Sequence, residues 1–211
     1  MGWCSHSFMA ELQNGRIIES DAATGAKLLS MGMGKKGEAG VILEWQEAAF
    51  LTERKLLEVR DGKKTLALED LLMEPEKETD PERTIKTKKR NAEERTASPA
   101  SSLPARSSVS LLSPPRADQY RIYRAIRGGG RVVRFTSGSP LYWRVYERGV
   151  GREQERPQML LYVVPADWSV SVQSLEQQMQ LARLLRLDLG LAFVRDGRAQ
   201  MMKISRPPVE G

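Results

Sequence analysis

The chain has 211 residues, 40% of them hydrophobic and only 6% aromatic, which suffices for one large packed domain or two small ones. Its net charge of +6 favours a polyanionic partner such as RNA, although mild basicity also serves solubility. With one cysteine, Cys4, and one histidine, His6, the chain has no internal disulfide, thiolate zinc cluster or multi-histidine metal site.

No stretch of the sequence approaches the roughly 20 apolar residues that a membrane-spanning helix needs. The N-terminus also lacks a cationic start followed by an apolar core, which marks a signal peptide. We therefore expect a cytoplasmic protein with no membrane association.

Residues 1–73 have the pattern of a small α/β unit. An Asn14-Gly15 turn precedes a candidate strand at 16–19. Asp21 is placed to cap a helix that runs to residue 29, with Ala22, Ala26 and Leu29 along one face. A further strand at 41–43, a helix at about 45–55 and the apolar segments 56–59 and 66–72 complete this N-terminal domain.

Residues 74–117 differ sharply in composition from the segments on either side. They contain no Phe, Trp or Tyr, and they combine prolines with the charged run KTKKRNAEER and the low-complexity run SPASSLPARSS. Such a segment buries too little apolar surface to offset its ordering entropy. We predict a flexible linker between two domains.

Residues 118–211 have the pattern of a second domain. Helical spacing over 118–126 is followed by alternating or continuously apolar stretches that resemble strands. A helix over about 172–186 interrupts them. The predicted fold is therefore α+β, with two small domains, the second a mixed sheet with flanking helices. The predicted strands of this domain are 131–135, 141–147, 159–164, 189–194 and 199–204.

Four segments, taken in order, resemble the archaeal tRNA-intron endonuclease family. In the first domain these are GRIIESDAATGAKLL and VILEWQEAAFLTERKLLEV. In the second they are QYRIYRAIRGGGRVVRFTSGSPLYWRVYERG and LARLLRLDLGLAFVRDGRAQMMKISR. The resemblance covers both domains, skips the linker, and implies the family's nuclease-like second domain.

Members of that family cut the bulge-helix-bulge of precursor tRNA with a metal-free Tyr, His and Lys triad. A tyrosine accepts the proton of the ribose 2′-hydroxyl, a histidine protonates the leaving 5′-oxygen, and a lysine stabilises charge on the phosphate. The product is a 2′,3′-cyclic phosphate. The resemblance therefore implies neither a metal nor a cofactor.

The triad positions, carried over by the resemblance, hold different residues here. The tyrosine position falls on Arg131, the histidine position on Tyr142 and the lysine position on Leu187. No histidine follows residue 6, so shifting the alignment by one residue restores nothing. The sequence predicts a non-catalytic, structural subunit that pairs with a catalytic one, usually as an α2β2 heterotetramer, on precursor tRNA.

The resemblance also implies contacts with partners. A last strand containing Met201, Met202, Lys203 and Ile204 would lie beside its counterpart in the other subunit, with ordinary core packing as the alternative. Asp196 would dock on the opposite dimer, or would simply form an Asp-Gly turn.

For RNA, the resemblance points to one arginine of the last segment, and charge adds three more, although a solvated sheet face explains the latter equally well. Two rival functions also remain at this stage: a catalytic subunit with unusual residues, and a free-standing RNA-binding module. The arginine implied by the resemblance is Arg206, and the three that charge adds are Arg131, Arg134 and Arg144.

Overall fold

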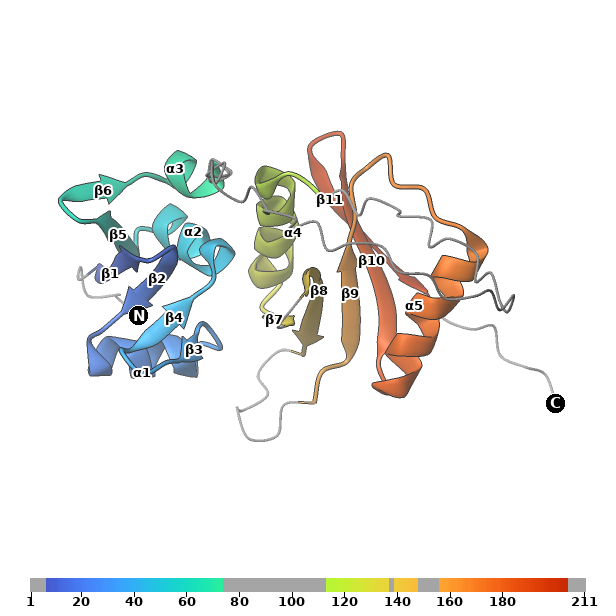
Figure 1. Ribbon diagram of the computed structural model, residues 1–211, viewed down its shortest axis with the longest axis horizontal. Coiled ribbons are helices and arrows are strands. Elements are labelled where there is room, and N and C mark those ends of the chain that lie inside the picture. The colour runs from blue at the N-terminus through green and yellow to red at the C-terminus, as the bar shows by residue number, and fades with distance from the viewer. Residues whose placement is uncertain (1–6, 74–112, 137–138, 148–155, 205–211) are drawn as a thin grey trace, which may run out of the picture. The chain divides into compact units, whose positions relative to one another are not determined.

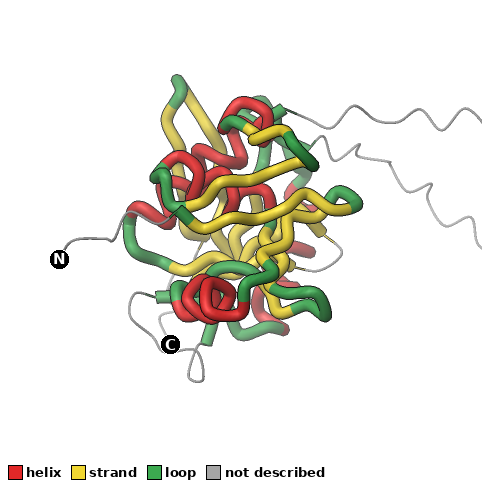
Figure 2. Tube along the Cα trace, turned by 90° about the vertical axis from the view of Figure 1, so that its left-hand side faces the viewer, coloured by secondary structure: helices red, strands yellow, loops and turns green. Residues whose placement is uncertain are grey.

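The strands of the protein form two sheets, one of six strands and one of five. The computed structural model describes residues 7–73, 113–136, 139–147 and 156–204 (Figure 1). Most of the predicted linker, residues 74–112, lies outside the described residues, as do Cys4, His6 and Arg206. The α+β class predicted from the sequence is confirmed, since both sheets carry helices (Figure 2).

The first sheet has the strand order β3-β4-β2-β1-β5-β6. Asn14 and Gly15, with φ of 49° and 74°, form the two-residue turn that joins β1 to β2. β1 lies at the centre of the sheet and pairs with β5 in parallel, although the sequence did not indicate a strand there. The six strands are β1 (Phe8–Gln13), β2 (Arg16–Glu19), β3 (Lys35–Lys36), β4 (Val41–Leu43), β5 (Leu57–Asp61) and β6 (Lys64–Leu66).

Three helices accompany this sheet: α1 (Ala22–Ser30), α2 (Trp45–Glu53) and α3 (Leu68–Leu72). Asp21 caps α1 as predicted, because its carboxylate accepts the Thr24 N–H at 2.7 Å. The predicted inner face of α1 is wrong at Ala22 and Ala26, which are exposed, whereas Leu29 is half-buried against the core. The buried residues of the helix are Gly25 and Leu28. A Cβ on Gly25 would lie 2.9 Å from Val41, so the absent side chain lets α1 approach β4 closely.

The second sheet has the order β11-β10-β9-β8-β7 and is mixed, as predicted. β9 and β10 run parallel and are connected through α5, while the other neighbours are antiparallel. β11 is an edge strand. The elements are α4 (Arg116–Gly128), β7 (Val132–Thr136), β8 (Ser139–Tyr146), β9 (Met159–Val163), α5 (Val172–Leu184), β10 (Asp188–Arg195) and β11 (Arg198–Ile204).

Helices α4 and α5 lie on opposite faces of the second sheet (Figure 1). Side chains alternate between the faces along each strand. Trp143, Val145 and Ala192 belong to the core that contains α4, whereas Leu160 and Leu189 pack with Ala182 of α5. The charged ends of these strands are therefore left at the margins of two apolar layers.

One core cluster includes residues from both sheets, joined through α2 and α4. The Tyr120 hydroxyl donates to Glu53 at 2.9 Å, and Phe50 meets Tyr123 edge to face at 5.8 Å. Arg116 lies over the ring of Trp45. These contacts attach the long helix of the second domain to the first domain.

Candidate functional site

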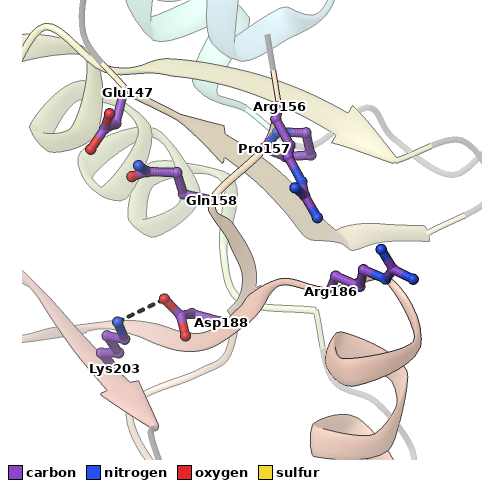
Figure 3. Close-up of a pocket in the computed structure, with 7 residues that line it drawn as sticks. All are labelled: Glu147, Arg156, Pro157, Gln158, Arg186, Asp188 and Lys203. Atoms are coloured by element: carbon purple, nitrogen blue, oxygen red, sulfur yellow. Dashed lines mark ion pairs between the residues drawn. The ribbon is translucent and has the colours of Figure 1, made fainter.

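A polar cavity of about 550 Å³ lies where β8 ends and β9 and β10 begin. Parallel strands start at the same edge of a sheet, and antiparallel neighbours end there, so this topology gathers residues that are distant in sequence. Figure 3 shows the side chains that surround the cavity. The lining residues are Glu147, Arg156, Pro157, Gln158, Arg186, Asp188 and Lys203.

The cavity has an excess of positive charge. Lys203 Nζ lies 2.7 Å from Asp188 Oδ2, which leaves Arg156 and Arg186 with the single carboxylate of Glu147. Within the described residues, neither arginine forms an ion pair. Guanidinium groups offer paired N–H donors that match the oxygens of a phosphate. The arrangement suits a phosphate group.

Arg186 occupies an unusual backbone position at the end of α5. Its φ is 56°, a left-handed conformation that glycine adopts most easily. The N–H of Leu187 bonds to the carbonyl of Ala182 at 2.9 Å, and that of Arg186 to Arg183 at 2.8 Å, which closes the helix in a Schellman motif. Arginine stands where glycine would be less strained, and its side chain lines the cavity.

The side chains that line the cavity are two carboxylates, three cations, an amide and a proline. They include no histidine, cysteine or tyrosine. The cavity offers binding groups for an anion and lacks the imidazole that most often serves as general acid or base.

Comparison with known proteins gives two matches to this chain. Residues 9–72 match the family described as tRNA intron endonuclease, N-terminal domain. A "tRNA-splicing endonuclease" of Thermococcus kodakarensis is 26% identical over 161 residues, covering 76% of this chain and 74% of the relative. Residues 9–72 therefore match the N-terminal domain of this family, and most of the chain is similar to a tRNA-splicing endonuclease. The resemblance seen in the sequence is thereby confirmed at the level of the family.

The three positions that correspond to the family's triad by resemblance do not lie together. Tyr142 and Leu187 pack in one apolar cluster with Leu160. Arg131 is exposed and lines a different cavity, of about 500 Å³, with Glu147. A three-group active site on one phosphate is therefore not assembled from these positions.

Tyr142 is also poorly suited to proton transfer. Burial raises the pKa of its hydroxyl above the usual value of 10. The hydroxyl donates to Gln178 Oε1 of α5, and the ring stacks on Tyr162 at 4.7 Å. Its contacts are those of a packed side chain between the sheet and α5.

The remaining predicted RNA contacts are partly brought together. Arg134 of β7 lies directly opposite Arg144 of β8, so both project from the same sheet face. Arg134 also lies 5.9 Å from the ring centroid of Tyr146. Two guanidinium groups on one face suit a polyanion, and their contact with RNA stays a prediction.

The predicted interface residues lie at the edge of the second sheet. Asp196 and Gly197, with φ of 52° and 71°, form a two-residue turn between β10 and β11, so the Asp-Gly turn is present. In β11, Met201 and Met202 are 45% and 51% exposed, Lys203 is exposed and Ile204 is half-buried. An edge strand with exposed apolar side chains is available for pairing. Docking by Asp196 stays a prediction.

The described residues show two further features that bear on ligands. No three His, Cys, Asp or Glu side chains gather there in a way that would hold a metal ion. The longest helices, α4 and α5, have 13 residues each, and no described helix has the length and apolarity to cross a membrane.

Sequence reasoning missed most of the cavity. Of its charged residues only Lys203 was identified, and for a different role. One signal was present: Arg186 separates a predicted helix from a predicted strand where a glycine would be usual. Glu147, Arg156 and Asp188 became recognisable only once the ends of the strands were placed next to one another.

Proposed function

We propose that this chain is a structural, non-catalytic subunit of a tRNA-splicing endonuclease. The observation that carries this proposal is the cavity at the ends of β8, β9 and β10, which has cations for phosphate but no histidine, cysteine or tyrosine among its lining residues. Loss of one acid-base group lowers rate by roughly 100- to 10,000-fold. The single histidine of the chain, His6, lies before β1, far in sequence from the cavity residues.

The chain would contribute shape and binding surface to a catalytic subunit in the cytoplasm. β11 would extend its sheet by pairing with a strand of that partner, since its outer edge carries no described neighbour. Arg156 and Arg186 would hold phosphates of the precursor tRNA, and Arg134 with Arg144 would provide a second cationic face. The catalytic partner would supply the groups that cut the bulge-helix-bulge.

Co-expression with a catalytic subunit tests the proposal. We expect the two chains to elute together on size-exclusion chromatography with the mass of a heterotetramer, and intron removal to require the catalytic chain. Cleavage of intron-containing precursor tRNA by this chain alone would show that it is catalytic and uses unusual residues. A chain that binds RNA but never associates with the catalytic subunit would be a free-standing RNA-binding module.

A further inference from the structure

A third cavity, also of about 500 Å³, differs in character from the polar one and from the cavity beside Arg131. Buried Met33 and Phe50 contribute apolar surface, while two arginines, Arg54 and Arg127, supply the charge. None of the lining residues is acidic. The full lining is Met31, Met33, Phe50, Arg54, Leu56, Arg127, Gly130 and Val132.

Close backbone approach shapes one wall of this cavity. Gly32 has φ of 72°, and a Cβ on it would lie 2.9 Å from a methyl group of Val132. Gly130, also left-handed with φ of 79°, turns the chain from α4 into β7. The segment around Met31 and the start of β7 are therefore held against one another, and the cavity beside them is preformed.

Arg127 is held in place by the backbone around the cavity. Its guanidinium donates to the carbonyl of Met31 at 3.0 Å and to that of Arg131 at 3.3 Å. An arginine has five N–H donors, so further donors remain after these two bonds. The charge is fixed at the cavity and retains hydrogen-bonding capacity.

Arg54 supplies a second cation next to an aromatic surface. Its guanidinium carbon lies 4.3 Å from the ring centroid of Phe50, within cation–π range, and its side chain is exposed. The pair offers a flat, cationic surface above an apolar floor. An unpaired nucleobase stacks on such surfaces, and its phosphate meets the exposed charge.

We propose that this cavity receives an unpaired base of the bound RNA, with the adjoining phosphate on Arg54. Two cations without a lining carboxylate favour a polyanionic occupant over a neutral apolar peptide. The cavity also adjoins Arg131, a predicted RNA contact, through the bond from Arg127. The proposal rests on the RNA-binding role proposed above, and it adds base recognition by the junction of the two domains.

Photocrosslinking of the full chain tests the site directly. The probe is a short RNA duplex with a bulged 4-thiouridine, compared with the same duplex in which that base is paired. We expect the bulged base to crosslink to peptides containing Met31, Met33 or Leu56, and the paired base not to do so. Crosslinks from the bulge that lie only in other peptides overturn the proposal.

A matched pair of variants separates this cavity from general electrostatics. Arg54→Gln and Lys55→Gln each remove one positive charge at the end of α2, but only Arg54 lines the cavity. We expect R54Q to weaken binding of bulged RNA several-fold more than that of paired RNA, and K55Q to weaken both slightly and equally. Thermal unfolding of both variants verifies that they fold.

The outcomes distinguish this inference from the proposed function. Equal effects of the two substitutions, with RNA binding otherwise intact, refute the base cavity and leave the structural-subunit proposal standing. Failure of the chain to bind either RNA, alone or with a catalytic subunit, refutes both.

Discussion

The carboxylate of Asp188 and the ammonium of Lys203 face each other across the last two strands at 2.7 Å, inside the polar cavity. Asp188 begins β10, and Lys203 of β11 is paired in register with Gly190. Strand alternation therefore places both charges on one sheet face. The pair neutralises one of the three cations of the cavity, and thereby limits the charge available to an anion.

Removal of the acidic partner should strengthen RNA binding. We expect Asp188→Asn to increase affinity for precursor tRNA several-fold and to steepen its salt dependence, because Lys203 becomes free to meet a phosphate. Both side chains are about half exposed, so stability should change little. Filter binding across a salt series measures the effect.

Asp196→Asn is the matched control for that substitution. It makes the same charge change in an exposed turn outside the cavity. An equal gain in affinity for both variants would mean that overall charge, rather than the position of Lys203, governs binding.

The strained position of Arg186 predicts opposite effects on stability and on binding. Arg186→Gly should raise the free energy of unfolding by about 1 kcal/mol, since a left-handed residue with a Cβ is strained by that order. The melting temperature should rise by a few degrees. RNA affinity should fall, because a guanidinium is lost from the cavity.

Lys55 provides a matched control at the end of α2. Its φ is 57°, and the N–H of Leu56 bonds to the carbonyl of Leu51 at 2.9 Å, as in the motif at Arg186. Lys55→Gly should therefore stabilise the protein similarly and leave RNA affinity nearly unchanged. If the two glycine variants lose affinity equally, the cavity has no special role.

The sequence predicted most elements in their correct order but not how their ends meet. β1 was missed because its alternating pattern is short and is interrupted by two successive apolar residues within the strand, Met9 and Ala10. In the structure these two residues do alternate, since Met9 is 50% exposed and Ala10 is buried. The buried face of α1 was misplaced because Gly25, which has no side chain, makes the closest approach to β4. Hydrophobic spacing does not register such a contact.

The candidate site was harder to predict for a related reason. Its charged groups come from the ends of four strands and one helix, and strand register, which brings them together, depends on tertiary packing. The family resemblance grouped Arg131 with Tyr142 and Leu187 as triad-equivalent positions. The structure separates Arg131 from the other two. Residue types were readable from the chain, but their grouping was not.

Charges on the exposed edge of β11 should block assembly with a catalytic subunit. Met201 lies opposite Ala192 and Met202 opposite Leu191, so the two side chains project from opposite faces of the strand. The double variant Met201→Glu and Met202→Glu would place carboxylates on both sides of a pairing edge, which disfavours strand addition. We expect the heterotetramer to dissociate on size-exclusion chromatography.

Gln200→Glu is the control on the same strand, because it adds a carboxylate at a position that is already polar and exposed. The double variant should keep its melting temperature within a few degrees, since both methionines are about half exposed. Assembly that survives the double variant would place the interface on another surface.

Glu47 predicts that stability falls as pH rises. Burial raises the pKa of its carboxyl to about 7, although N–H donors of Glu44 and Gly34, each at 3.0 Å, lower it in part. The Glu44 carboxylate raises the pKa and Arg127 lowers it. The unfolded value is near 4.5. Between these two values the folded state holds a proton that the unfolded state has released, so unfolding becomes easier as pH increases.

The effect should be largest between about pH 4.5 and 7 and should level off above that range. At 1.36 kcal/mol per pKa unit, the loss of stability is at most about 3 kcal/mol. Urea unfolding at several pH values measures it. The side chain of the Glu47→Gln variant does not ionise, so the variant should lose this dependence of stability on pH. Its amide also places an N–H donor against the N–H of Gly34 or Glu44, which should lower stability at every pH. Equal slopes in the two proteins would assign the pH dependence to another carboxyl, with Glu19 first among them, because burial raises its pKa as well.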